Sequence, residues 1–301
     1  QSARNVDLHP DFWKWSLVER KVWFTREVMV NHVPAEILPG DLLAGARFNL
    51  QGSRCWNKKE AAARDRMIYG KKGARATMKW FHDHGYGNSG ATSGHLIPWY
   101  ERVLKTGWKG IYTDLETRYN SLSTSEKNGP RGAQLRAMMT AATMPRDLAY
   151  KYSELCTGLS LKEKNPGRKQ ELELMAKNLS SIPWDPAQNF WEALQSLWIT
   201  HMLIMSDENY PGPGVSFGRF DQYLLPYWRK SIAQGMDRDF GKEILKCFWF
   251  HCNTVYDAMV QVGNQGITSG FGQLITLSGM GKDGKDMTNE LTYVILEVID
   301  E

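Results

Sequence analysis

Residues 82–84 read His-Asp-His, and two imidazoles beside a carboxylate are a common start for a metal site. No further His or Cys follows at ligand spacing, so we expect a polar helix end here and no metal ion. Asp83 could also complete a nucleophilic triad with Ser93 and His95. The loop around them, GYGNSGATSG at 85–94, lacks a nucleophile elbow and both common nucleotide-binding patterns. Neither hydrolytic nor nucleotide chemistry is therefore expected from it.

Two carboxylates, Asp207 and Glu208, could share acid–base work. They open the stretch DENYPGPGVSFGRFDQY at 207–223, in which four alternating Pro and Gly residues forbid a regular element. A short strand at 215–218 and a new helix opened by Arg219 and Asp221 follow. We expect the acids to anchor this loop, with Arg219 paired to Asp207 or Glu208.

The four cysteines are Cys55, Cys156, Cys247 and Cys252. They are too few and too scattered for a disulfide scaffold, and no CxxC pair suggests zinc. We therefore expect reduced thiols in the core.

Composition narrows the function classes. Hydrophobic residues make up 42% of the 301 residues, enough for a sizeable core, and the net charge of +4 comes without a basic stripe. We expect no nucleic-acid partner. No apolar run reaches the ~18 residues that span a bilayer, and the first residues do not form a signal peptide. We expect a cytoplasmic protein, and both ends read as cut from a longer one.

Apolar periodicity predicts mostly helix. Helices are expected at 10–30, 58–69, 75–82, 97–121 with a break near 107–110, 131–160, from 166, from an N-cap at Asp185, from 237, and at 288–301. Weak alternation suggests a strand at 42–50, and QLITLS at 273–278 suggests a buried one. His201 and His251 fall inside aromatic helices and read as core histidines. A short buried strand between long helices indicates an α/β fold with helices outside a barrel.

Four segments occur in the order typical of one enzyme family. They are GHLIPWY at 94–100, EALQSLW at 192–198, SFGRFDQYLLPY at 216–227 and NELTYVILE at 289–297. On these the chain resembles the glycyl radical enzymes of the pyruvate formate-lyase type. Three further segments, at 80–98, 205–219 and 247–258, look most like the large subunits of the benzylsuccinate synthase group.

The resemblance implies that residues 1–301 are the N-terminal and central part of one pyruvate formate-lyase-like domain, a helix-rich fragment of a ten-stranded α/β barrel. The family's cysteine loop and glycyl radical motif would lie downstream. The implied cofactor is a glycyl radical on a downstream Gly, installed by a radical S-adenosylmethionine activating enzyme. The radical passes to a cysteine, which takes hydrogen from the substrate. This chain would then supply pocket wall and no catalytic residue.

The implied activity is fumarate addition to toluene or a related methyl-arene, a lyase reaction of anaerobic toluene degradation. The implied partners are the aromatic hydrocarbon, fumarate, the activating enzyme and small accessory subunits in a hetero-oligomer. Naphthylmethyl- and alkylsuccinate synthases, and glycyl radical decarboxylases or eliminating enzymes, remain alternatives, as does a non-catalytic scaffold. By position, the expected substrate-binding residues are Tyr86, His95, Ser216, Ile267, Thr268, Phe271 and Leu274, with Arg219 and Asp221 holding the loop.

Overall fold

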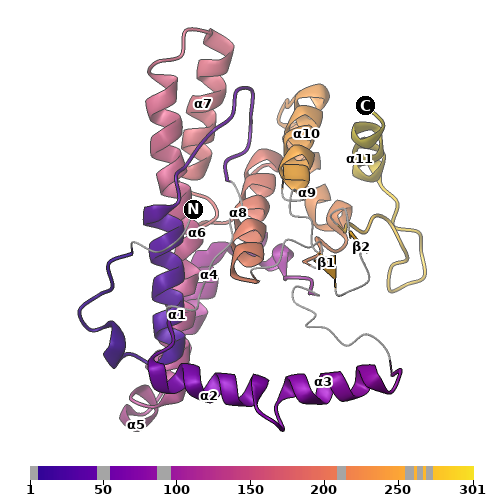
Figure 1. The fold of residues 1–301 in the computed structure, drawn as a ribbon. Helices are drawn as coiled ribbons and strands as arrows, with labels where there is room; N and C mark the ends of the chain where they lie inside the picture. Colours follow the sequence, from indigo (N-terminus) through magenta and orange to yellow (C-terminus); the bar gives the residue numbers. More distant parts are fainter. Residues whose placement is uncertain are drawn as a thin grey trace.

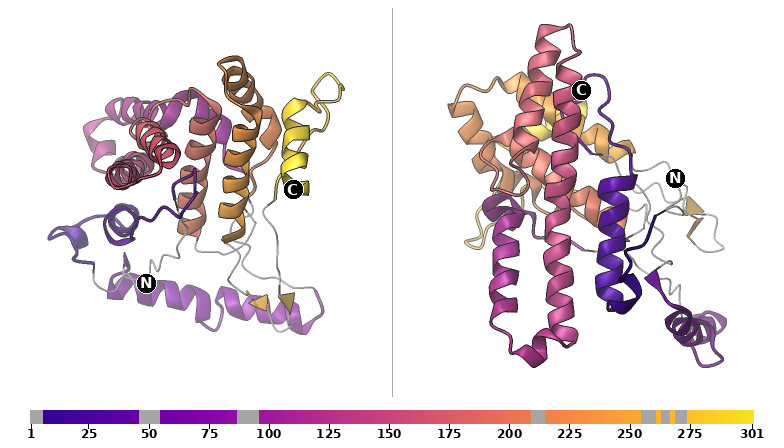
Figure 2. Two further views of the ribbon diagram at one scale, coloured as in Figure 1. Left: turned by 90° about the horizontal axis from the view of Figure 1, so that it is seen from above. Right: turned by 90° about the vertical axis from the view of Figure 1, so that its left-hand side faces the viewer.

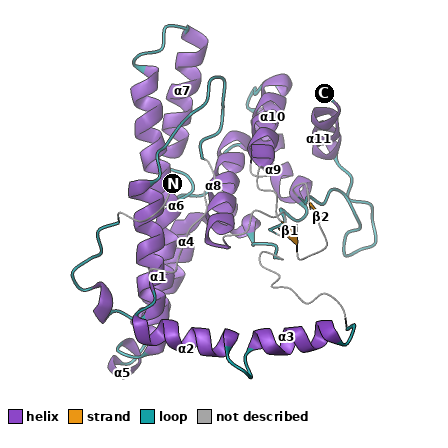
Figure 3. Cartoon of the chain, in the orientation of Figure 1, coloured by secondary structure: helices purple, strands orange, loops and turns teal. Residues whose placement is uncertain are grey.

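A computed structural model describes residues 6–45, 55–86, 96–208, 215–254, 261–262, 267–268 and 274–301. Helices dominate these residues, as Figure 3 shows. They follow the order η2 (Phe12–Lys14), α1 (Leu17–Arg26), η3 (Glu27–His32), α2 (Lys58–Tyr69), α3 (Ala74–Asp83), α4 (Tyr100–Asn120), α5 (Thr124–Lys127), α6 (Pro130–Ser160), α7 (Pro166–Leu179), α8 (Phe190–Glu208), α9 (Phe220–Ala233), α10 (Arg238–Thr254), β1 (Gln261–Val262), β2 (Ile267–Thr268) and α11 (Glu290–Asp300).

The first layer is a helical bundle built around α6. Helices α1, α4 and α7 lie against α6, which continues through Pro145 without ending (Figure 1). Helix α4 is interrupted where the sequence predicted a break, at Gly107, whose φ of 64° favours glycine. The carbonyls of Pro183 and Trp184 accept hydrogen bonds from the amides of Trp108 and Lys109 just past this break. The 182–187 turn is thereby fixed against α4.

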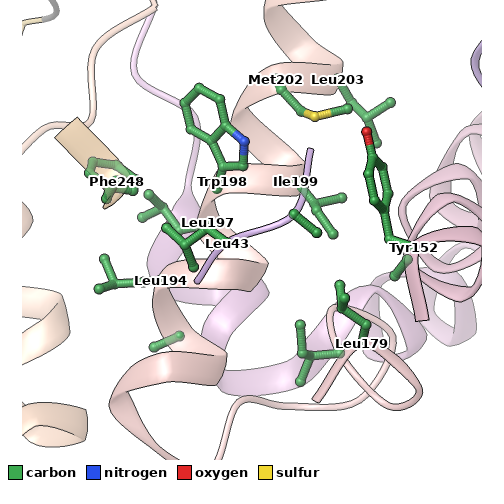
Figure 4. Packing of buried hydrophobic residues seen from close by; sticks show 14 of the residues in the cluster. Leu43, Tyr152, Leu179, Leu194, Leu197, Trp198, Ile199, Met202, Leu203 and Phe248 are labelled. Carbon is green, nitrogen blue, oxygen red and sulfur yellow. The ribbon is translucent and has the colours of Figure 1, made fainter. Parts of the chain in front are cut away.

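Helix α8 lies between this bundle and the pair α9–α10 (Figures 1 and 2). Its apolar face was correctly predicted, since Phe190, Leu194, Leu197, Trp198 and Met202 are all buried. Figure 4 shows Trp198 and Leu197 beside Phe248 of α10, with Leu43 packed into the same cluster. The Trp198 indole N–H donates to the carbonyl of Gly45, so this large ring is buried without losing its polar contact.

Three sequence expectations are corrected. The helix expected from Asp185 begins at Phe190, because Asn189 caps it by accepting from the amide of Glu192. The helix expected over 10–30 is divided into η2, α1 and η3. Residues 42–45 form no strand, and the rest of the strand expected at 42–50 lies outside the described residues.

Other expectations are confirmed. Asn165 caps α7, α10 begins after Asp237, and α11 buries Leu291, Val294, Ile295 and Val298. His201 is fully buried, and all four cysteines are free thiols.

Helix α11 also has a second apolar face. Tyr293, Leu296 and Ile299 follow one another at i, i+3 and i+6, and they are 60%, 50% and 61% exposed. A helix that is apolar on both sides is ordinarily covered on both. Exposed apolar stripes of this kind favour association.

We therefore expect the isolated 301-residue chain to self-associate and to be inactive. Replacing Leu296→Lys and Ile299→Lys together should lower the apparent mass measured by size-exclusion chromatography with light scattering. A control pair, Leu161→Lys with Leu174→Lys, adds the same charge on other exposed apolar residues and should leave the association in place. Equal masses for wild type and the α11 variant would contradict the assignment.

Candidate functional site

Three extended segments lie side by side as the start of a parallel sheet. Leu96 pairs with Val215, and Arg219 pairs with Thr276, both as parallel bridges. The amide of Ser216 donates to the carbonyl of Leu96, at 3.0 Å, and that of Phe217 donates to the carbonyl of Leu274, at 3.2 Å. The strands expected at 215–218 and 273–278 are therefore not formed as such: residues 215–219 and 274–276 are extended and contact their neighbours through isolated bridges, with the 215–219 segment in the middle.

Side chains alternate across these segments, as they do on any pleated strand. Val215 and Phe217 are buried, and Ile275 and Leu277 pack against the same helical core. The opposite face carries Ser216, Gly218, Leu274 and Thr276. We call this surface, together with Ile97, the open face.

The open face is predominantly apolar. Leu274 is 58% exposed and Ile97 65% exposed. Gly218 adopts a φ of 65°, and a Cβ placed there would lie 2.9 Å from Cγ2 of Ile97, so the absence of a side chain lets Ile97 approach the backbone. The Ser216 hydroxyl on this face donates to the carbonyl of Leu274 and accepts from the amide of Gly218, each at 3.2 Å.

Two side chains of opposite charge, Arg219 and Asp221, bind the same residue, Ser278, which ends the extended segment that starts at 274. The Arg219 guanidinium donates to the carbonyl of Ser278 from Nε at 3.1 Å and from Nη2 at 2.6 Å. The fully buried Asp221 carboxylate accepts from the amide of Ser278 at 2.9 Å and from the Thr292 hydroxyl. Ser278 has a φ of 57°, a left-handed conformation that few side chains favour. We call this arrangement the Ser278 clamp.

The described partners of Arg219 are backbone carbonyls, so the expected pairing with Asp207 is wrong, and the side chain of Glu208, the other expected partner, lies outside the described residues. The third hydrogen bond of the Arg219 guanidinium also goes to a carbonyl, that of Met280. Asp207 lies exposed at the end of α8. Backbone carbonyls satisfy the guanidinium because the chain turns sharply there and directs two of them toward it. Arg219 and Asp221 bind the loop at 278–280, and most of the loop for which their role was predicted, residues 209–214, lies outside the described residues.

Aromatic side chains pack against the buried face of the extended segments, around Phe217. The Tyr100 hydroxyl and Nδ1 of His201 share a hydrogen bond of 2.7 Å, and the His201 ring lies 4.1 Å from that of Phe217. The Tyr223 hydroxyl donates to the carbonyl of Phe217 at 3.0 Å. Burial raises the pKa of both tyrosines well above the ordinary value, so they stay neutral and serve as hydrogen-bonding supports.

The thiols of Cys156, Cys247 and Cys252 are not activated as nucleophiles by their surroundings. Burial raises the pKa of Cys156 and of Cys247 to about 11, and that of Cys252 further still. Cys55 is buried as well. A thiol with a raised pKa is protonated at neutral pH and is a poor nucleophile.

The sequence-predicted site residues are only partly brought together. Ser216 and Leu274 share the open face. Tyr86 is 68% exposed after α3, and its described contacts are with the rings of Trp80, Phe81 and His84. His95 and Phe271 lie outside the described residues. Ile267 and Thr268 form β2, antiparallel to β1, with only their backbone described.

Sequence reasoning missed Ile97, Gly218 and Thr276. The alternation in LITL at 274–277 and in VSFG at 215–218 carried the signal for the last two. Nothing in the sequence placed Ile97 over Gly218. In the described part of the chain, no three His, Cys, Asp or Glu side chains gather as metal ligands, and no helix there could span a membrane.

Comparison with known proteins gives a consistent picture. A family model described as "Pyruvate formate lyase-like" matches residues 53–301. Isethionate sulfite-lyase of Oleidesulfovibrio alaskensis is 29% identical over 228 residues, covering 74% of this chain and 26% of that protein. Indoleacetate decarboxylase of Tractidigestivibacter scatoligenes is 45% identical over 69 residues, covering 23% of this chain and 8% of that protein.

A glycyl radical enzyme from Archaeoglobus fulgidus has the same fold, with a TM-score of 0.75 at 23% identity, over 95% of this chain and 42% of that one. The helix-rich architecture is thus part of the glycyl radical enzyme barrel. The chain spans about a quarter of the first curated relative's length.

The Ser278 clamp yields a stability prediction. Asp221→Ala leaves the Ser278 amide and the Thr292 hydroxyl without their acceptor, and losing hydrogen bonds to a buried charge should cost about 1.5–3 kcal/mol. The measurement is the urea midpoint at low protein concentration. Asp239→Ala, an exposed carboxylate in the first turn of α10, is the control and should shift the midpoint far less. Equal shifts would show that the clamp carries no stability.

Proposed function

The chain belongs to the pyruvate formate lyase-like family of glycyl radical enzymes, and from that premise we propose that it is part of a catalytic subunit that adds a methyl-substituted arene to fumarate. Toluene is the proposed smallest substrate. The observation that carries the proposal is the apolar open face, on which Ile97 and Leu274 are exposed and no described side chain is charged. A hydrocarbon offers no polar group to bind, so it requires such a wall.

The similarity of residues 80–98, 205–219 and 247–258 to the benzylsuccinate synthase group supports the same choice. Proposed partners are fumarate, small accessory subunits and the activating enzyme.

Within this proposal the residues of this chain orient the substrate and enclose it. Ser216 fixes the spacing between its own segment and the next through Leu274, and Gly218 lets Ile97 close over the backbone. The glycyl radical, on a Gly downstream of these residues, would supply hydrogen-atom abstraction through a cysteine. Cys55, Cys156 and Cys252 are buried, and Cys247 lies beside Asp41, so none belongs to the open face. The wall must exclude water and side reactants, because carbon radicals react with many groups.

A second candidate is a decarboxylase or eliminating lyase. The matches to indoleacetate decarboxylase and to isethionate sulfite-lyase favour it. Such enzymes act on carboxylated or sulfonated substrates, and a charged substrate favours a charged partner, whereas the polar groups of the open face are the hydroxyls of Ser216 and Thr276. A non-catalytic scaffold has the least support.

The proposal is tested on the full-length subunit with its accessory subunits and activating enzyme, kept free of oxygen. Toluene with fumarate should give benzylsuccinate, detected by mass spectrometry, while isethionate and indoleacetate should be left unchanged. Electron paramagnetic resonance of the glycyl radical separates failed activation from a wrong substrate. A radical signal with turnover of either charged substrate, and none of toluene, would reject fumarate addition.

A substrate-size prediction rests on placing Thr268 at the pocket wall. Thr268→Phe should exclude 2-methylnaphthalene while sparing toluene, because an extra ring in a packed pocket costs about 1–3 kcal/mol. The readout is the ratio of kcat/KM for the two arenes. Thr157→Phe, on an exposed part of α6, is the control. An unchanged ratio in Thr268→Phe would remove that residue from the wall.

A further inference from the structure

A cavity of about 360 Å³ lies between the helical bundle and α8, away from the open face. Its walls come from α1, α4, α6 and α8, which Figure 1 shows as neighbours on one side of the molecule. Helix α8 separates the two sites. His201 on α8 contacts Phe217 behind the sheet, whereas Leu203, Ile204 and Asp207 on another side of the same helix line the cavity.

The cavity exists because α6 presents small residues toward it. Ala137, Ala141 and Pro145 stand at i, i+4 and i+8, on one side of the helix, and all three line the space. The facing side chains of α1 and α8 do not reach across, so room for a ligand remains. Roughly 300–1,000 Å³ is the usual size of small-molecule sites.

The lining favours an aromatic ligand. Met29, Met138 and Met144 contribute polarizable thioethers, which make favourable contacts with aromatic rings. Trp108 also lines the cavity, and its indole N–H donates to the hydroxyl of Thr200 at 3.0 Å. With its polar atom already satisfied, Trp108 offers the ligand a ring surface.

The charged side chains at the rim of the cavity favour neither an anionic nor a cationic ligand. Lys21 of α1 and Asp207 of α8 are both exposed there, carry opposite signs, and form no ion pair with another described residue. An anion attracted by one would be repelled by the other, so the rim favours an uncharged molecule.

We propose that this cavity is a second binding site, for an uncharged aromatic molecule of one or two rings. An apolar cavity of roughly 150 Å³ stays dry and binds benzene in another protein, so the larger space here accommodates two fused rings. The inference stands on the cavity's own residues and does not require fumarate addition.

The test uses the full-length subunit without activation, so that no turnover occurs. Equilibrium dialysis against radiolabelled naphthalene measures how many equivalents bind and how tightly. Ala141→Phe fills the cavity and should abolish one bound equivalent or weaken it by about tenfold or more. Ala63→Phe adds the same ring on the exposed side of α2 and should bind naphthalene as the wild type does.

Circular dichroism checks that each variant is folded. If Ala141→Phe does not fold, Met138→Ala decides, since this 42%-exposed side chain can be shortened safely and its loss should weaken binding about threefold or more. Wild-type protein that binds no naphthalene, or cavity variants that bind it unchanged, would overturn the site. Failure of toluene turnover would leave this result untouched.

Discussion

The open face depends on one buried carboxylate. Asp221 is fully buried, and a buried charge is strongly disfavoured unless hydrogen bonds replace its water. The Ser278 amide and the Thr292 hydroxyl both donate to Oδ2, while Oδ1 has no hydrogen-bond partner among the described residues. The two bonds tie the start of α9 to the segment that ends at Ser278 and to α11. Arg219, two residues earlier, holds the carbonyl of the same Ser278. The two charges therefore fix both polar groups of one residue, and with them the position of the strand that carries Leu274 and Thr276.

This arrangement shows what the sequence could and could not predict. The charged pair before a helix was identifiable, because Arg219 and Asp221 stand where no packing reason requires them. Their partners were not, because a backbone carbonyl leaves no mark on the sequence and Ser278 lies 59 positions from Arg219. From side chains alone, an arginine is expected to pair with an acidic residue, and the acids expected to pair with Arg219 were Asp207 and Glu208. The described partners of Arg219 are instead backbone carbonyls about 60 positions further along the chain.

The same limit explains the corrected start of α8. Asp185 and Asn189 both fit an N-cap, and local propensity does not separate them. Tertiary hydrogen bonds do: the Leu104 carbonyl accepts from the Ala187 amide, and α4 amides bind the carbonyls of Pro183 and Trp184. These bonds keep the chain out of helical geometry until Asn189. Where burial alone decides, as on the inner faces of α8, α10 and α11, the 3.6-residue period was sufficient.

Helix α8 connects the two apolar regions of the molecule. One of its sides supports the sheet through His201 and Phe217, and another lines the cavity with Leu203 and Ile204. A displacement of α8 toward the bundle would close the cavity and withdraw the support behind Ser216 together, because a packed helix moves as a unit. Trp198 opposes that displacement from within α8, since its ring contacts Phe248 of α10 and its indole N–H is bonded to Gly45. The geometry of the open face is thus set on both sides of the sheet, by the Ser278 clamp at its edge and by the anchored α8 behind it.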